Sequence, residues 1–334
     1  MAIAITVREL RDDELDARIG DAALQALERI HVDDVLAYTD RGLEDLPSYR
    51  ELYERAIRQQ WSPFELDFSR DRAEWEGLSD ETRHRRLYTL RLFLGGEDRV
   101  ASLLAPLVWA SPTKEIAAFL ATQLHDEVRH TMFFDRYWRE VVDSSAPELD
   151  ALLEQVSPRR ESPQYDHLLH EWLPALADHL ASNPGDEDVM VQFVTVYHLV
   201  VEGALFLAGL RYQMEGARRW GRTFDFYRGL TATTRDESRH VLFGVRFLRD
   251  MVARDAGRFA PIVRSAISRS VPIIEAQLSA RDGDLSPYGG RHLSEAWPGY
   301  TPRQMQAEVL EYARTILERR LHAIGVRMDL GAAG

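Results

Sequence analysis

A five-residue string that occurs twice restricts the fold of this chain more than any other feature. It reads Asp126-Glu127-Val128-Arg129-His130 and again Asp236-Glu237-Ser238-Arg239-His240. Each copy lies inside a long helical pattern, where a Glu and a His three positions apart project from one face, one turn apart. Two such faces can share one metal site, provided that the two helices pack side by side.

Composition narrows the possible donors and partners. The 334 residues are 45% hydrophobic, which is typical of a globular chain that buries a substantial core. There is no cysteine, so disulfides, zinc sites with thiolates and iron-sulfur clusters are excluded, and a metal must be held by carboxylates and imidazoles. The net charge of -13 argues against a nucleic-acid partner, because phosphate binding relies on clustered Lys and Arg.

The chain carries no recognisable targeting or membrane segment. Residues 1–9 lack a basic region followed by a long apolar run, as a signal peptide would have. The apolar run 199–210 is interrupted by Glu202 and is too short to span a bilayer. We therefore expect a cytoplasmic protein rather than a transmembrane one.

Helical patterns dominate the chain, and we find no convincing strand. Short amphipathic pieces are predicted at 21–30 and 49–60. Longer helices are predicted over 79–109, 111–138, 165–180, 186–214, 218–252, 258–278 and 301–324. The last begins with the capping box Thr301-Pro302-Arg303-Gln304. We predict one all-helical domain over 61–325, an N-terminal helical extension over 1–60 packed on it, and a short tail over 326–334.

Two more glutamates lie in apolar helical surroundings, where a carboxylate is stable only if it is paired or bound to a metal. They are Glu97 and Glu202. With the two Glu-x-x-His pairs they make a set of six: Glu97, Glu127, His130, Glu202, Glu237 and His240. This is the ligand set of ferritin-like dimetal carboxylate proteins, in which a four-helix core is surrounded here by additional helices. Its oxygen-rich donors suit iron or manganese.

Several neighbours of these residues have weaker assignments. Asp126 and Asp236 are candidates for orienting a ligand histidine through its far nitrogen, and we favour this role for Asp236 only. Arg129 and Arg239 are expected to form ion pairs between helices. His198 is interpreted as a packing residue rather than a ligand.

The order of the six candidate ligands resembles that in the small, oxygen-activating subunit of class I ribonucleotide reductase and in its relatives, the ligand-binding oxidases. The similarity covers about residues 61 to 250. Val100, three residues after Glu97, and Tyr197, five before Glu202, stand where those oxidases form a valine-tyrosine ether crosslink. The resemblance implies a homodimer with a manganese/iron centre, or two irons as the alternative, which uses dioxygen and binds a fatty-acid-like ligand.

Three functions remain open. A conventional reductase subunit keeps a radical tyrosine four residues after the first ligand histidine, where this chain has Phe134, and the tail 327–334 lacks a tyrosine. Together with Val100 and Tyr197 this favours an oxidase over a reductase subunit that serves a large catalytic partner. The third possibility is a ferritin-like metal-binding protein, which would lack a substrate-sized apolar cavity.

The spacing between Tyr197 and Glu202 is unsuited to a regular helix. Five residues correspond to a rotation that leaves the two side chains about 140° apart. A π-bulge, which is frequent at functional sites, could bring both to one face.

Overall fold

The computed structural model describes residues 11–142, 148–156, 163–219, 221–222, 224–278 and 301–331. Within them the chain is all-α and contains no strand, as predicted. The elements in order are α1 (Asp12–Asp21), η1 (Leu24–Leu27), α2 (Val32–Gly42), α3 (Tyr49–Arg58), η2 (Pro63–Glu65), α4 (Ser69–Glu76), α5 (Asp80–Trp109), α6 (Lys114–Tyr137), η3 (Trp138–Val142), α7 (Leu149–Val156), α8 (Pro163–His167), η4 (Leu168–Trp172), α9 (Leu173–Ser182), α10 (Glu187–Val194), η5 (Thr195–Phe206), α11 (Leu207–Arg219), α12 (Asp225–Arg254), α13 (Ala256–Leu278) and α15 (Pro302–Ile324).

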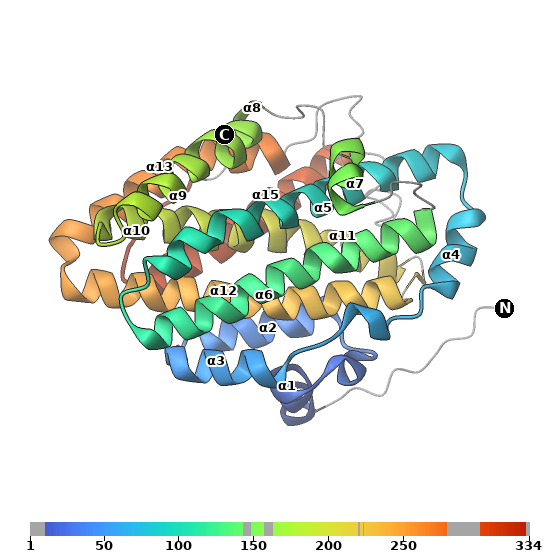
Figure 1. Ribbon diagram of the computed structural model, residues 1–334, viewed down its shortest axis with the longest axis horizontal. Coiled ribbons are helices and arrows are strands. Elements are labelled where there is room, and N and C mark those ends of the chain that lie inside the picture. Colours follow the sequence, from blue (N-terminus) through green and yellow to red (C-terminus); the bar gives the residue numbers. More distant parts are fainter. Residues whose placement is uncertain are drawn as a thin grey trace.

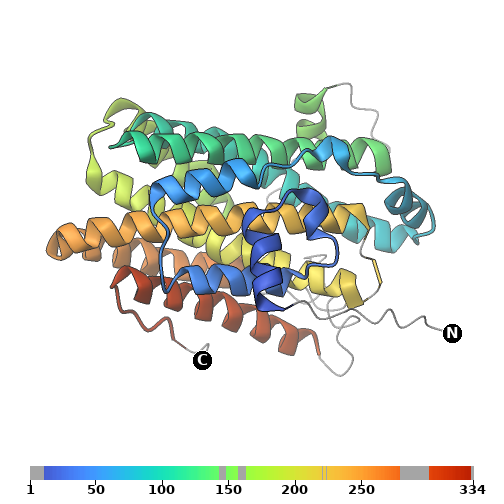
Figure 2. The same ribbon diagram turned by 90° about the horizontal axis from the view of Figure 1, so that it is seen from below.

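Four long helical segments form the core of a ferritin-like bundle. α5 packs along α6, α6 packs along α12, and α12 packs along the continuous segment α10, η5 and α11 (Figure 1). The remaining helices cover this core from outside: α2 and α3 lie against α12 and α6, and α13 and α15 lie against η5 and α12 (Figure 2). Each copy of the repeated string therefore lies on a central helix.

The N-terminal helices share the apolar interior of the bundle, because one continuous cluster of buried side chains extends from Ile19 to Leu330. The predicted piece at 49–60 is confirmed as α3. Ser48 caps it by accepting a hydrogen bond from the Glu51 N–H at 3.2 Å. The piece predicted at 21–30 is wrong. The chain there forms the short 3-10 helix η1 between α1 and α2, and it buries Leu24 and Leu27 at the three-residue spacing of that helix.

The boundary between α11 and α12 differs from the prediction of a helix starting at 218. Gly221 adopts a positive φ of 69°, and the Arg222 N–H donates to the Ala217 carbonyl at 2.8 Å. This bond closes the end of α11 in the manner of a Schellman motif and delays the next helix to Asp225. The predicted capping box at Thr301 is confirmed, with the Gln304 N–H donating to its hydroxyl at 3.3 Å.

The segment Glu187–Arg219 is one continuous helical rod, longer than the apolar run considered from the sequence. By length and composition alone it could cross a membrane, but 94% of its most apolar window is buried inside the protein. In this fold it is the central helix that carries Glu202.

Candidate metal centre

The structure brings all six predicted ligand residues together in the middle of the four-helix core. Each is at most 3% exposed. Their donor atoms form two groups, each with all atoms within 4.8 Å of one another. The first metal position comprises Glu97, Glu127, His130 and Glu237, and the second comprises Glu127, Glu202, Glu237 and His240. The two glutamates of the repeated strings belong to both positions and are suited to bridging two ions.

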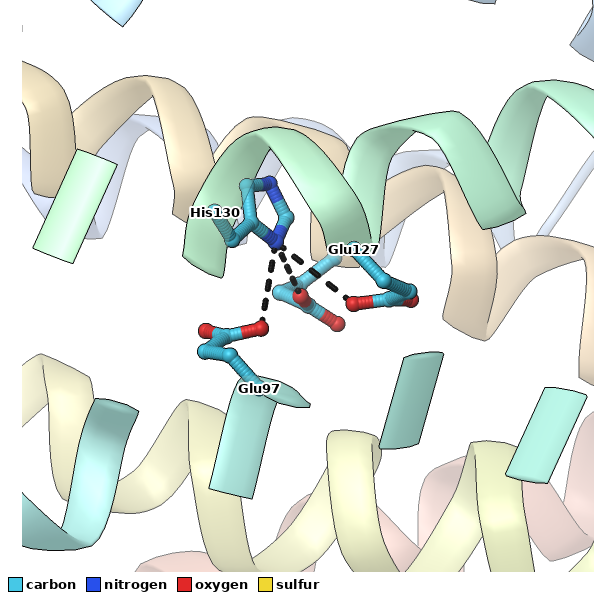
Figure 3. A group of neighbouring side chains, drawn as sticks. Glu97, Glu127 and His130 are labelled. Atoms are coloured by element: carbon cyan, nitrogen blue, oxygen red, sulfur yellow. Dashed lines mark ion pairs between the residues drawn. The ribbon is translucent and has the colours of Figure 1, made fainter. Parts of the chain in front are cut away.

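His130 directs one ring nitrogen into the carboxylates of the first position (Figure 3). Its Nδ1 lies 3.3 Å from Glu97, 3.4 Å from Glu237 and 3.6 Å from Glu127. Among the described residues this buried nitrogen has no hydrogen-bond partner, and neither do Glu97 Oε1, Glu127 Oε2 and Glu202 Oε2. Buried polar atoms without partners are costly, so these four atoms have the character of metal donors.

His240 occupies the same place in the second position. Its Nδ1 lies 3.3 Å from both Glu127 and Glu237 and 3.7 Å from Glu202. The two imidazoles therefore approach the shared carboxylates with the same ring nitrogen from opposite ends of the cluster.

The electrostatics of the cluster favour bound cations. Burial raises the pKa of Glu97 to about 8, and burial with the nearby charges of Glu237 and Glu127 raises that of Glu202 well above its usual value. Burial opposes a charged His240, but Glu237 and Glu127 outweigh it and raise its pKa to about 9. Four carboxylates crowded in an apolar interior attract positive charge, and two divalent ions would neutralise them. The residues present fit a pair of metal ions.

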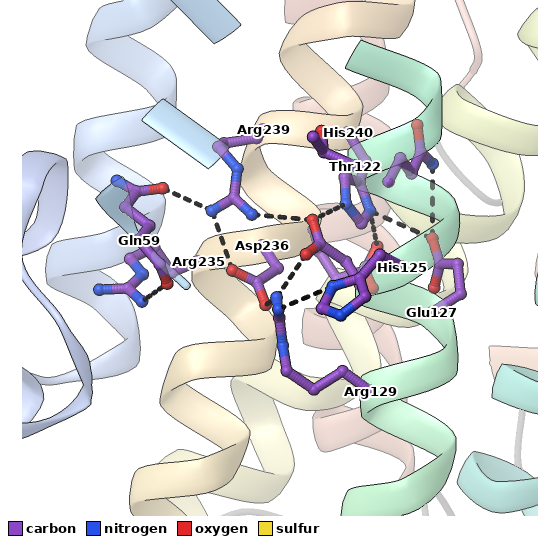
Figure 4. A network of polar contacts seen from close by, with 12 residues as sticks. Gln59, Thr122, His125, Glu127, Arg129, Arg235, Asp236, Arg239 and His240 are labelled. Carbon is purple, nitrogen blue, oxygen red and sulfur yellow. Dashed lines mark hydrogen bonds and ion pairs between the residues drawn. The ribbon is translucent and has the colours of Figure 1, made fainter. Parts of the chain in front are cut away.

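The far nitrogens of the two histidines are held crosswise by the repeated strings. Figure 4 shows part of this polar network, with Asp236 between Arg129 and Arg239 and with His240 nearby. His130 Nε2 donates to Asp236 at 3.2 Å, and His240 Nε2 donates to Asp126 at 3.1 Å. Each histidine is thus oriented by the aspartate of the other copy, which leaves Nδ1 free for a metal. The preference for Asp236 alone was wrong, because Asp126 makes the equivalent contact.

The arginines of the two strings complete this network as the expected ion pairs between helices. Arg129 donates to Asp236 at 2.8 Å, and Arg239 donates to Asp126 at 2.9 Å. Burial opposes the charge of Asp236, but Arg239 and Arg129 outweigh it and hold its pKa well below the usual value. Both aspartates therefore stay ionised and can keep accepting from the histidines.

Trp61 is a further neighbour of the centre that sequence reasoning missed. Its Nε1–H donates to Asp236 at 2.8 Å, and its ring stacks on that of His130 with centroids 6.4 Å apart. An oxidisable indole is thus joined to a candidate ligand through one carboxylate. The chain gives no local signal for this contact, because the two residues are 175 positions apart.

Tyr197 and Val100, the predicted crosslink candidates, lie against each other. The Tyr197 hydroxyl donates to the Val100 carbonyl at 3.1 Å, and the phenol is fully buried. The expected π-helical distortion is confirmed, since η5 is a π-helix over Thr195–Phe206. Its i to i+5 hydrogen bonds bring residues five apart, such as Tyr197 and Glu202, closer to one face than a regular helix does.

A cavity opens beside the metal positions and reaches the surface. Its enclosed volume is about 60 Å³, so a larger ligand would have to extend into its open mouth. Four of the candidate ligands line it, together with Val100 and mostly apolar side chains that include Phe93, Leu169, Val201, Leu205 and Phe206. Phe134 lies behind this wall, stacked on Phe93 with centroids 5.6 Å apart.

Comparison with known families agrees with this geometry. The profile of the family "Ribonucleotide reductase, small chain" matches residues 45–274, which contain every candidate ligand. The chain belongs to this family.

The solved structures that are similar to this chain include R2-like ligand-binding oxidases. One variant with an anaerobically reconstituted Mn/Fe cofactor aligns with a TM-score of 0.66 and 22% identity, covering 83% of this chain and 93% of that one. Another, reconstituted aerobically, aligns with a TM-score of 0.60 and 21% identity over 85% and 87% of the two chains. At these identities the similarity establishes a shared fold.

Gln123 is a second neighbour of the metal centre that the sequence alone did not single out. It lies four residues before Glu127, hence one turn away on the same face of α6, and its Nε2–H donates to Glu202 at 2.8 Å. The helical spacing was a usable signal, although polar residues one turn from a ligand are too common to single it out.

Proposed function

We propose that this chain is a dioxygen-activating oxidase with one manganese and one iron ion in its two metal positions, two irons being the alternative. We further propose that its first oxidation joins Val100 to Tyr197 through an ether bond. The observation that carries this proposal is the 3.1 Å hydrogen bond from the Tyr197 hydroxyl to the Val100 carbonyl oxygen. Val100 also lines the cavity together with four of the candidate ligands.

The residues around the phenol prepare it for this reaction. Burial, reinforced by Glu127 and Glu202, raises the pKa of Tyr197 well above its usual value, so the hydroxyl keeps its proton until it is oxidised. Donation to the Val100 carbonyl fixes the direction of the O–H bond. Glu97 Oε1 has no hydrogen bond among the described residues, so this carboxylate can change its mode of binding.

Electron balance defines what the metal ions must supply. Ether formation removes one hydrogen from the Tyr197 hydroxyl and one from a side-chain carbon of Val100. The two electrons released, with two more from the reduced centre and two protons from solvent, convert dioxygen to two molecules of water.

The cavity supports an apolar ligand with an acidic head, such as a fatty acid. Its walls are mainly aliphatic and aromatic, and the four glutamates of the metal positions also line it. A carboxylate head would meet the metal ions while the hydrocarbon tail packs on Val201, Leu205 and Phe206. Such a cavity is also what distinguishes an oxidase from a ferritin-like metal store.

Peptide mass spectrometry after aerobic reconstitution with manganese and iron tests the proposal. We expect one linked species that contains the peptides of Val100 and Tyr197 and is lighter by two hydrogens. A Tyr197→Phe variant should load the same metals and give separate peptides. Fully loaded wild-type protein with both peptides separate and unmodified would refute the crosslink.

A reductase small subunit is the second candidate, favoured by the hydrogen-bonded series Trp61, Asp236 and His130, which offers an electron route out of the centre. It predicts binding to a large reductase subunit and support of nucleotide reduction. Phe134 stacks in an apolar setting and offers no phenol beside the first metal position.

A further inference from the structure

Two fully buried side chains form a relay that ends on Glu202. His198 Nε2 lies 3.1 Å from Gln123 Oε1, and Gln123 Nε2 lies 2.8 Å from Glu202 Oε1. With Glu202 ionised, as it would be when it binds a metal ion, the amide nitrogen donates to the carboxylate and the imidazole donates to the amide oxygen. Burial lowers the pKa of His198 to about 3, so the ring is neutral and carries the single N–H that this direction needs.

The fold reserves space for this relay. A Cβ at Gly244 on α12 would come within 2.4 Å of the His198 Cβ, so the histidine fits only because α12 has a glycine there. Gln123 lies one turn before Glu127 on α6, and His198 lies four residues before Glu202 in η5. The interpretation of His198 as a packing residue therefore omitted its polar role.

The two metal positions differ in this respect. Four residues before Glu237, the place equivalent to Gln123 is Thr233, and its buried hydroxyl has no hydrogen-bond partner among the described residues. Glu97, the terminal carboxylate of the first position, has Oε1 equally without a partner. Glu202 is thus held by an amide donor, whereas among the described residues Glu97 has the His130 ring, at 3.3 Å, as its polar partner.

We propose that Gln123 and His198 are positioning residues that make the two metal positions unequal. The amide holds Glu202 through Oε1, which lies 3.7 Å from His240 Nδ1, so the carboxylate is kept at the second position while Oε2 has no hydrogen bond among the described residues. A carboxylate fixed in this way needs no reorganisation on binding, so the second position binds its ion first and more tightly. Glu97 stays adjustable and lets the first position accept a different ion. This inference rests on the dimetal centre of the proposed function.

Calorimetric titration of the full-length metal-free chain with Mn²⁺, and with Fe²⁺ without air, tests the proposal. Wild type should bind two ions in two steps of different affinity. Gln123→Met, which keeps the length of the side chain but loses its donor, should weaken the tighter step about 10- to 100-fold and leave the other unchanged. Anomalous diffraction should locate the loss at the position of Glu202 and His240.

The matched control is Thr233→Val, a similarly conservative change at the equivalent place, which should leave both steps unchanged. If Gln123→Met does not fold, the pair His198→Leu and His198→Gln decides, because only glutamine retains a donor for Gln123. The proposal is wrong if Gln123→Met, or His198→Leu, leaves both steps as in wild type or weakens both equally. Failure of wild type to bind two ions would instead overturn the dimetal centre itself.

Discussion

The copy of the repeated string on α6 and the copy on α12 make the same contacts with each other but stand in different surroundings. Each supplies a bridging glutamate, a histidine and an aspartate that holds the histidine of the other copy. The residues one helical turn outside the two strings differ. Four residues before the glutamate, Gln123 corresponds to Thr233, and four residues after the histidine, Phe134 corresponds to Gly244. The string therefore builds a symmetric frame, and its neighbours give the two halves different properties.

The strongest test of the symmetric frame is to neutralise each aspartate in turn. Asp126→Asn and Asp236→Asn should each lower the free energy of unfolding of the metal-free protein by about 3–5 kcal/mol, because Arg129 and Arg239 then share one carboxylate and one buried positive charge is left uncompensated. Urea denaturation at pH 7 measures both. Nearly equal losses are expected, and a large loss at Asp236 beside a negligible one at Asp126 would show that the frame is not symmetric.

The glycines of α12 test the space reserved beside the frame. A Cβ at Gly244 would meet the Cβ of His198 at 2.4 Å, whereas one at Gly229 would meet the ring of Phe133 at 2.3 Å. Both alanine variants should lose about 1–3 kcal/mol of stability. Gly244→Ala should lose more, since a Cβ cannot move without its backbone, and only this variant should also weaken binding of one metal ion. Thermal unfolding and metal titration of both variants check the difference.

Trp61 contacts only one of the two aspartates and so tests a smaller asymmetry. Trp61→Phe keeps an aromatic ring against His130 but removes the hydrogen bond to Asp236. The loss of stability should be about 1–2 kcal/mol, as for a hydrogen bond to a charged group. The control Trp75→Phe changes a buried tryptophan away from the centre. An unchanged rate of reduction of the oxidised metal centre in Trp61→Phe would contradict a role in electron transfer.

Asp71 in α4 accepts a hydrogen bond from the Phe226 N–H at the start of α12. It extends the comparison to a buried carboxylate that has no ion pair with an arginine among the described residues. Burial raises its pKa to about 7, with Asp225 and Glu74 adding to the effect. Because folding raises the pKa of Asp71, this carboxyl makes the folded protein less stable as the pH rises from about 4 to 7. Asp71→Asn should therefore raise the free energy of unfolding at pH 8 by an amount on the order of 1 kcal/mol and change it little at pH 4, as urea denaturation at the two pH values measures. Asp236→Asn has the opposite sign, since a depressed pKa stabilises the fold above pH 4. Stabilisation by Asp71→Asn that is equal at both pH values would contradict this account.

The sequence was sufficient for most of the long helices and for the six candidate ligands because both follow from short-range spacing. Glu-x-x-His on a helix and a lone Glu in an apolar helix are local patterns, and the π-helical distortion followed from the separation of Tyr197 and Glu202. Trp61 and the crosswise pairing of Asp126 depend on contacts between residues more than a hundred positions apart. The relay through Gln123 and His198 needed the packing of α6 on η5 and a glycine on a third helix, α12, which no local pattern reports.

Anomalous diffraction at the manganese and iron absorption edges, on crystals of protein loaded with both metals, tests the central claim most directly. We expect two ions about 3.5–4 Å apart, both bound by Glu127 and Glu237, with one beside His130 and the other beside His240. A single ion, or ions bound elsewhere while this cluster stays metal-free, would contradict the account.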